Sequence, residues 1–118
     1  MKAFVINLKR RKDRLDHITK ECKRVGLDMV LVEAVDGKVD FPEENPRIIQ
    51  AAFGCYESHR KVLKLIKESG ESGLIIEDDN IFCEKFWEEF SKRAEELPND
   101  YDIYFLGGSL LLDNAIED

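Results

Sequence analysis

Four short segments of the chain combine apolar side chains with flanking charged or turn residues. This pattern is typical of buried β-strands, because a strand inside a parallel sheet has apolar neighbours on both faces. The segments are 2–8 (KAFVINL), 28–35 (DMVLVEAV), 74–77 (LIIE) and 101–108 (YDIYFLGG). The pair Asp36-Gly37 directly follows the second segment and predicts a turn.

Between these strands, residues that share one face recur at steps of three or four, which predicts amphipathic helices. The first helix covers 12–25 and ends at Gly26, because glycine readily adopts the left-handed conformation that closes a helix. The second covers 55–67, and a third follows 74–77. The positions that define the three faces are Leu15, Ile18, Cys22 and Val25, then His59, Val62, Leu63 and Ile66, then Phe86, Phe90 and Ala94.

Residues 38–53, with two prolines, predict a long loop, and long loops in compact domains are often functional. Strands and helices otherwise alternate, which predicts a single α/β domain with a mostly parallel sheet and helices on both faces. Ligands of such sheets bind beyond the carboxyl ends of the strands. We therefore expect the site to use 7–14, Asp36-Gly37, the acids 77–79 and Gly107-Gly108.

Composition narrows the classes of function. The 118 residues carry a net charge of −7, which argues against nucleic acid as a general partner. The sequence contains no apolar run long enough to span a membrane and no signal peptide, so we expect a cytoplasmic protein. Three separated cysteines favour neither disulfides nor a structural zinc site, and we interpret Cys22 and Cys55 as small packing residues.

Three adjacent acids, Glu77, Asp78 and Asp79, follow the third strand. If the chain stays extended there, Glu77 and Asp79 point to one side and Asp78 to the other. Two carboxylates at a strand end suit a hard divalent cation, Mg²⁺ or Mn²⁺, that would bridge to phosphate oxygens. The alternative is a solvated acidic turn.

A basic cluster, 9–14, precedes the first helix, whereas thirteen acids against three bases give the segment from Glu77 onward a local net charge of −10. Cations at a helix start oppose the helix dipole unless an anion binds between them and the free N–H groups. We therefore assign Arg11 and Arg14, three residues apart, to phosphate or nucleotide binding. For Lys9, Arg10 and Lys12 a solvated helix start is the simpler interpretation.

Two further residues have alternative interpretations. His59 shares its predicted face with apolar residues, so it is either a buried, hydrogen-bonded side chain or part of the site. Asp36 is either a turn residue or a contact to the ribose or base of a nucleotide.

Five segments, in order, resemble glycosyltransferase family 25, which includes the lipooligosaccharide galactosyltransferases of bacteria and the collagen galactosyltransferases. They are FVINLKRRKDR, VEAVDG, GCYESH, LIIEDD and LPNDYDIYFLGG, and they cover Phe4 to Gly108. The resemblance implies a GT-A-type, Rossmann-like fold and inverting transfer of a sugar, galactose above all, from a UDP-sugar. It also implies a divalent metal, a saccharide or glycolipid acceptor, and a role in lipopolysaccharide biosynthesis.

The family's site residues transfer onto matching positions of this chain. The resemblance implies that Glu77, Asp78 and Asp79 bind the metal. It also implies that the remaining matched positions lie near the nucleotide: Asn7, Arg11 and Arg14 in the first motif, Asp36 and Gly37 in the second, and Gly54, Ser58 and His59 in the third.

Members of this family are usually considerably longer than 118 residues, so we expect much of the acceptor site and the general base to lie outside this sequence. The main alternative is a non-catalytic module that binds a nucleotide sugar or pairs with another subunit. The apolar segment 109–116 (SLLLDNAI) would suit such association, including a homo-oligomer.

Overall fold

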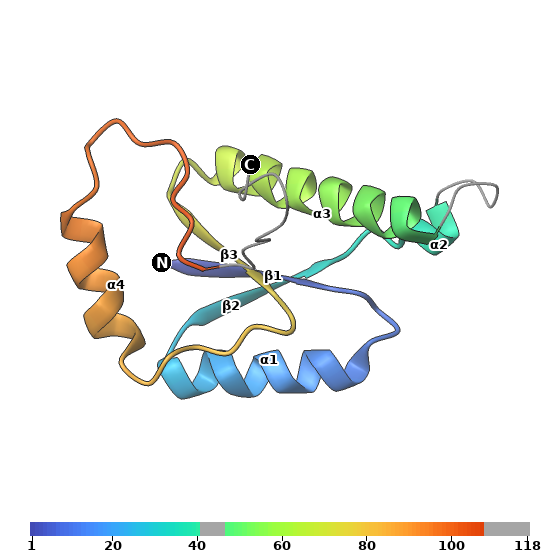
Figure 1. The fold of residues 1–118 in the computed structure, drawn as a ribbon, viewed down its shortest axis with the longest axis horizontal. Helices are drawn as coiled ribbons and strands as arrows, with labels where there is room; N and C mark the ends of the chain where they lie inside the picture. The colour runs from blue at the N-terminus through green and yellow to red at the C-terminus, as the bar shows by residue number, and fades with distance from the viewer. Residues whose placement is uncertain (41–46, 108–118) are drawn as a thin grey trace, which may run out of the picture. The chain divides into compact units, whose positions relative to one another are not determined.

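The computed structural model describes residues 1–40 and 47–107 (Figure 1). Contacts between residues divide the chain into two compact units, Met1–Cys83 and Glu84–Asp118. Within the described residues, the first unit contains the sheet and most of the helices. The elements are β1 (Lys2–Asn7), α1 (Lys12–Val25), β2 (Asp28–Glu33), α2 (Gly37–Asp40), α3 (Arg47–Ser69), β3 (Gly73–Glu77) and α4 (Phe86–Glu95).

The sheet of the first unit is parallel, with the strand order β2-β1-β3. The central strand β1 pairs with both neighbours, and its residues from Ala3 to Asn7 are all buried. This burial explains why the apolar run of β1 is nearly continuous, since both faces of a central parallel strand are covered. The predicted parallel α/β architecture is therefore confirmed for this unit.

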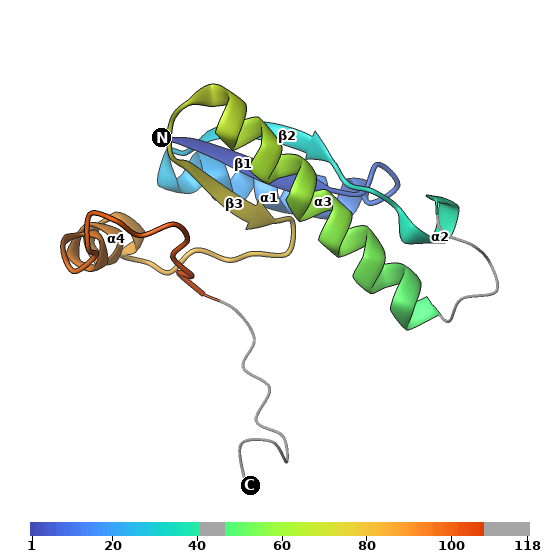
Figure 2. The same cartoon turned by 90° about the horizontal axis from the view of Figure 1, so that it is seen from above.

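Helices cover both faces of this sheet. Figure 1 shows α1 on one face and α3 on the other, and Figure 2 shows α3 lying across β1 and β3. The chain goes from β1 to β2 on one side and then returns across β1 to β3 on the other. The direction of winding thus reverses between β1 and β3, and the carboxyl ends of strands at such a reversal are where open α/β sheets bind ligands.

Helix α1 has the predicted bounds. Ile18 and Cys22 are fully buried, whereas the opposite side carries charged residues. Gly26 closes the helix with φ of 72°, a left-handed conformation that residues with a Cβ atom adopt only at a cost. The interpretation of Cys22 as a packing residue is also confirmed.

Helix α3 corrects the predicted loop at 38–53. It starts at Arg47, well before the predicted start at Cys55, and α2 occupies Gly37–Asp40; residues 41–46 lie outside the described part. Its buried side also differs, because Leu63 is 44% exposed. The residues that face the sheet follow each other at four-residue steps: Gln50, Gly54, Ser58, Val62 and the partly buried Ile66.

The predicted fourth strand is wrong for the described residues 101–107, which form no strand, and Gly108 lies outside them. An alternating apolar pattern does not make a strand by itself, because a strand also needs a neighbour that pairs with its main chain. In the same unit, the predicted third helix is confirmed as α4. Its aromatic rings Phe86, Trp87 and Phe90 pack against one another with centroids 5.1 to 5.8 Å apart.

Candidate functional site

Asn7, the last residue of β1, connects three parts of the site. Its side-chain Nδ2 donates one hydrogen bond to the Arg11 main-chain oxygen at 3.1 Å and another to Asp78 Oδ2 at 2.8 Å. Both amide hydrogens are therefore used. Because Asn7 is only 4% exposed, this side chain fixes the end of β1, the start of α1 and the turn after β3 in the absence of competing water.

The acids 77–79 do not continue the strand. β3 ends at Glu77, and the Asn80 main-chain N–H donates to the Glu77 oxygen at 3.2 Å, which closes a turn around Asp78 and Asp79. Asp78 is buried against Asn7, whereas Glu77 and Asp79 are exposed. The turn therefore replaces the expected strand-like alternation and separates one buried carboxylate from two exposed ones.

The two arginines assigned to the nucleotide have different carboxylate partners. The Arg11 guanidinium holds Asp13 through two hydrogen bonds of 3.0 and 2.9 Å and lowers the pKa of that carboxyl to about 2. Arg14 Nη1 lies 3.5 Å from Asp78 Oδ1, which is a long contact for an ion pair. Arg14 is thus the charged partner of the buried Asp78. Because this contact uses only Nη1, most of the five N–H donors of its guanidinium can still bind another anion.

Asp36 and Gly37 form the start of α2. Asp36 accepts a hydrogen bond from the Lys38 main-chain N–H at 3.1 Å and caps the helix. It also pairs with Arg10 at 2.9 Å, and this hydrogen bond lowers the pKa of Asp36. The basic cluster alone predicts only a solvated role for Arg10. The signal that indicates this pair is that Arg10 and Asp36 follow neighbouring strands at the same sheet edge.

Two glycines allow α3 to approach this turn closely. A Cβ atom on Gly37 would overlap the main-chain oxygen of Gln50, and one on Gly54 would lie 2.7 Å from the Val35 oxygen. Neither position accommodates a side chain without a main-chain shift. Both glycines of the family-like motifs thus have a packing role, whatever they do toward a ligand.

Ser58 connects α3 by a hydrogen bond to Val35, two residues after the end of β2. Its hydroxyl donates to the Gly54 main-chain oxygen at 2.6 Å and accepts from the Val35 main-chain N–H at 2.8 Å. The residue is 1% exposed. The structure therefore accounts for Ser58 by internal hydrogen bonds, and its assignment to nucleotide binding stays a prediction.

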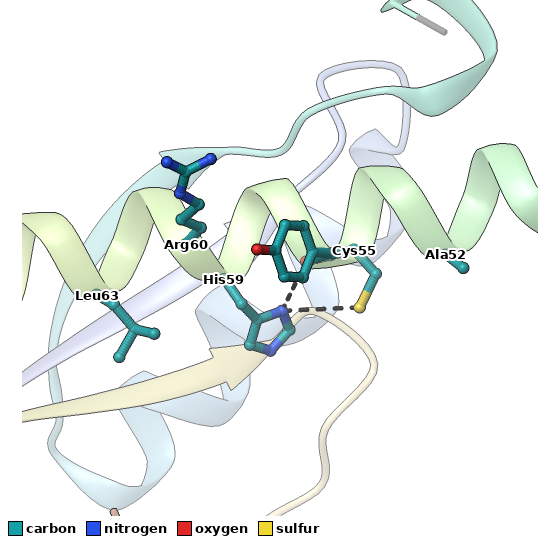
Figure 3. A pocket seen from close by; sticks show the side chains of 6 residues that line it. Ala52, Cys55, His59, Arg60 and Leu63 are labelled. Atoms are coloured by element: carbon teal, nitrogen blue, oxygen red, sulfur yellow. Dashed lines mark hydrogen bonds between the residues drawn. The ribbon is translucent and has the colours of Figure 1, made fainter. Parts of the chain in front are cut away.

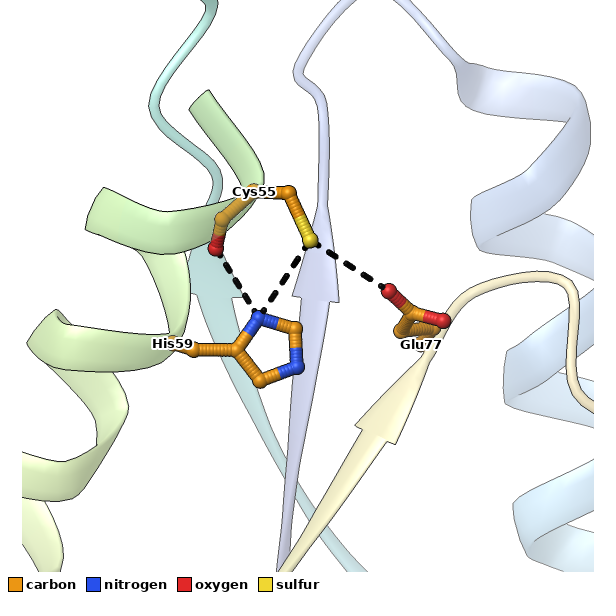
Figure 4. A group of neighbouring side chains, drawn as sticks. All are labelled: Cys55, His59 and Glu77. Atoms are coloured by element: carbon orange, nitrogen blue, oxygen red, sulfur yellow. Dashed lines mark hydrogen bonds between the residues drawn. The ribbon is translucent and has the colours of Figure 1, made fainter. Parts of the chain in front are cut away.

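Cys55 and His59, one turn apart on α3, face the exposed acid Glu77 (Figure 4). Cys55 Sγ lies 3.7 Å from His59 Nδ1 and 3.8 Å from Glu77 Oε1, and His59 Nδ1 donates to the Cys55 main-chain oxygen at 2.9 Å. The interpretation of Cys55 as a packing residue is wrong, because the residue is exposed. The sequence contains one signal for this cluster: Cys55 and His59 are four residues apart, so on a helix they lie on the same face.

The electrostatics of this cluster keep the thiol protonated. Desolvation of its sulfur and, secondarily, the charge of Glu77 raise the pKa of Cys55. Cys55 and His59 also line an open groove of about 610 Å³ along α3. Figure 3 shows the side chains that line this groove. The other residues of the groove are Ala52, Tyr56, Arg60 and Leu63.

The chemistry of the acids fits a hard divalent cation. Mg²⁺ and Mn²⁺ take carboxylate oxygens and usually complete their coordination with water and substrate phosphate. Glu77 and Asp79 offer exposed carboxylates within one turn. Asp78 is already hydrogen-bonded to Asn7 and lies near Arg14, so the residues that would hold the ion are Glu77 and Asp79.

The sequence matches glycosyltransferase family 25 (LPS biosynthesis protein) over residues 1–111, and the chain belongs to this family. The mouse procollagen galactosyltransferase 2 is 30% identical over 125 residues, which cover 88% of this chain and 20% of that protein. The procollagen lysyl hydroxylase and glycosyltransferase of Acanthamoeba polyphaga mimivirus is 29% identical, over 89% of this chain and 15% of that protein. No solved structure matches the chain at a significant level.

A glycosyltransferase 25 family member of Drosophila melanogaster is 23% identical over 97% of this chain and 22% of its own length. The chain thus spans about a fifth of the length of the relatives it matches. Among the described residues, no helix is long and apolar enough to cross a bilayer. The cytoplasmic location stays a prediction.

Proposed function

We propose that this chain is the nucleotide-sugar-binding part of a glycosyltransferase, and that the donor binds at the carboxyl ends of β1 and β3. The observation that carries the proposal is the hydrogen-bonded set Asn7, Asp78 and Arg14 at the point where the winding of the sheet reverses. Two general facts support the proposal: open α/β sheets bind ligands at this edge, and membership of a glycosyltransferase family implies a nucleotide-sugar donor.

The residues of the set have separate roles in this proposal. Arg14 donates hydrogen bonds to a phosphate oxygen, Asp78 orients its guanidinium, and Asn7 keeps the Asp78 carboxylate in place. A divalent ion held by Glu77 and Asp79 would neutralise the diphosphate as it leaves. Without a cation, these exposed acids repel the diphosphate, so donor binding depends on metal.

Galactose is the sugar that we propose, in a UDP donor. The support is that several relatives are named procollagen galactosyltransferases. For the acceptor we propose a saccharide or glycolipid of lipopolysaccharide type, because the family description names that biosynthesis. The association of chains into a homo-oligomer stays a prediction, and the segment 109–116 on which it was based lies outside the described residues.

Arginine variants test the donor site. We expect Arg14→Ala to weaken binding of UDP in the presence of Mn²⁺ by ~1–3 kcal/mol, the contribution of a charge-assisted hydrogen bond. Lys12→Ala is the matched control, because Lys12 is an exposed cation at the same helix start. Isothermal titration calorimetry measures both. Equal losses in the two variants would indicate general electrostatics and remove the assignment of Arg14.

Turnover separates a transferase from a binding module. The assay supplies UDP-galactose, Mn²⁺ and a panel of saccharide acceptors and follows the release of UDP. Acceptor-dependent release shows a complete transferase. Donor binding without any release supports the module, because transfer also needs a positioned acceptor and a general base, whose loss typically costs ~10²–10⁴ in rate.

A further inference from the structure

The cluster of Cys55, His59 and Glu77 combines three kinds of metal ligand from two elements. Cys55 and His59 project from successive turns of α3, and Glu77 ends β3. One ligand atom from each residue lies within 4.8 Å of the other two. Among the described residues, no other group of three such side chains meets this condition, so the acids 77–79 do not converge in this way.

We propose that Cys55, His59 and Glu77 bind a thiolate-preferring divalent ion, with Zn²⁺ as the best match. Thiolate, imidazole and carboxylate are each ligands that Zn²⁺ takes in proteins, whereas Mg²⁺ and Mn²⁺ prefer oxygen alone. This site is chemically separate from the hard-ion site of the proposed function, although both use Glu77.

The distances agree with tetrahedral coordination. Zinc lies about 2.3 Å from sulfur and about 2.0–2.2 Å from nitrogen or oxygen, so a sulfur ligand and a nitrogen or oxygen ligand at the tetrahedral angle are about 3.6 Å apart. The sulfur lies 3.7 Å from His59 Nδ1 and 3.8 Å from Glu77 Oε1. The sulfur–nitrogen and sulfur–oxygen distances therefore need to change by only about 0.1–0.2 Å to match this ideal value.

One proton leaves the protein when the ion binds. It is the thiol proton of Cys55, which the Glu77 carboxylate now attracts. His59 Nδ1 now donates to the Cys55 main-chain oxygen; on binding, this hydrogen bond is given up and the single proton of the neutral ring moves from Nδ1 to Nε2. The Cys55 thiol must be deprotonated to bind the ion, and the released proton gives a measurable heat.

Three protein ligands leave the fourth position of a tetrahedral ion open. Structural zinc sites have four protein ligands, whereas sites with three keep a position for water or another ligand. Cys55 and Glu77 are exposed, and Cys55 and His59 line the groove along α3. The ion is therefore expected to exchange with solvent and to be unnecessary for folding.

The shared Glu77 has a consequence that depends on the proposed function. Zn²⁺ held by Cys55 and His59 takes the Glu77 carboxylate away from the hard ion that supports donor binding. Zn²⁺ should then abolish Mn²⁺-dependent binding of UDP to the wild-type chain. Cys55→Ser should keep that binding in the presence of Zn²⁺.

The absorption spectrum of bound Co²⁺ detects the proposed metal site directly, and the experiment requires no nucleotide. Co²⁺ replaces Zn²⁺ in tetrahedral sites, and a cobalt–thiolate bond adds charge-transfer absorption in the near ultraviolet to the visible bands of the ion. We expect both features in the wild-type chain, to be displaced by Zn²⁺. Cys55→Ser should remove the charge-transfer band, whereas Cys83→Ser, which changes another exposed cysteine, should retain it.

Affinity provides a second measurement. Competition with a chromogenic chelator should show that Cys55→Ser, His59→Ala and Glu77→Gln each weaken Zn²⁺ binding by at least the ~10–100-fold that changing a hydrogen-bond partner of a metal ligand typically costs. Circular dichroism of each variant checks that the fold is retained. Absence of the charge-transfer band in the wild type, its loss in Cys83→Ser alone, or unchanged Zn²⁺ affinity in all three variants would overturn the proposal. None of these results bears on donor binding, so the two proposals fail separately.

Discussion

Replacing Asn7 by alanine removes the hydrogen bonds that connect β1, α1 and the turn after β3. In the Asn7→Ala variant, the buried Asp78 Oδ2 loses a donor at 2.8 Å, and the Arg11 main-chain oxygen loses one at 3.1 Å. A hydrogen bond to a charged group contributes ~1.5–3 kcal/mol and a neutral one ~0.5–1.5 kcal/mol. We therefore expect the free energy of unfolding to fall by ~2–4 kcal/mol, a large part of the ~5–15 kcal/mol typical of a domain.

Urea denaturation followed by circular dichroism measures this loss. With a slope of ~2 kcal/mol per molar urea, in the middle of the ~1–3 range of small proteins, the midpoint should fall by about 1–2 M. Asp79→Asn is the matched control, because it changes an exposed carboxyl in the same turn and should alter stability by less than ~0.5 kcal/mol. A loss below that value for Asn7→Ala would refute the reasoning, since it would mean that water replaces the amide.

A double-mutant cycle assigns the loss to one contact. The cycle combines Asn7→Ala with Asp78→Ala. If Asn7 acts through Asp78, their effects on the free energy of unfolding should show a coupling energy of ~1–3 kcal/mol. The Asn7→Asp variant adds a pH test, because the charge of Asp78 raises the pKa of the carboxyl introduced beside it. An acid whose pKa is raised in the folded state stabilises the fold below its unfolded pKa, so this variant should gain stability as the pH falls.

Three further substitutions test the packing around the sheet. Ser58→Ala leaves the partly buried Val35 N–H without its acceptor and should cost ~1–3 kcal/mol in urea denaturation. Gly54→Ala places a Cβ atom 2.7 Å from the Val35 oxygen and should cost ~1–3 kcal/mol by overpacking; a neutral result would contradict the close approach. Hydrogen bonds from Arg24 above all lower the pKa of Glu21 from 4.5 to about 2, so the stability it contributes is present above pH 4.5 and lost as the pH falls through about 2. Denaturation of Glu21→Gln should accordingly differ from wild type at neutral pH and converge near pH 2.

The order of apolar, polar and glycine residues correctly predicted the elements whose bounds depend on neighbouring residues. The bounds of α1 follow from its apolar period and from Gly26, and the three paired strands follow from short apolar runs. The start of α3 was missed because two prolines, Pro42 and Pro46, predicted a loop over all of 38–53, although α3 already begins at Arg47. The glycine at position 54 is needed for the approach of α3 to the Val35 oxygen, a contact between distant segments that no local pattern contains.

The partners within the site also depend on distant contacts. The sequence predicts that Asn7 and the acids 77–79 share a sheet edge, because both follow parallel strands. It does not predict that Asp78 alone turns inward, since this depends on the turn closed by Asn80 and on an amide 71 residues away. Cys55 was misinterpreted for a related reason: its exposure depends on which side of α3 meets the sheet.

Calorimetric titration of UDP in Mn²⁺ and, separately, in EDTA tests the central claim most directly. We expect the affinity to be at least ~10-fold higher with Mn²⁺, because bridging by the ion replaces repulsion between the diphosphate and the exposed acids. Asp79→Asn should reduce only the Mn²⁺-dependent part of that affinity. Equal affinity for UDP in Mn²⁺ and in EDTA would contradict a metal-bridged donor site at the carboxyl ends of β1 and β3.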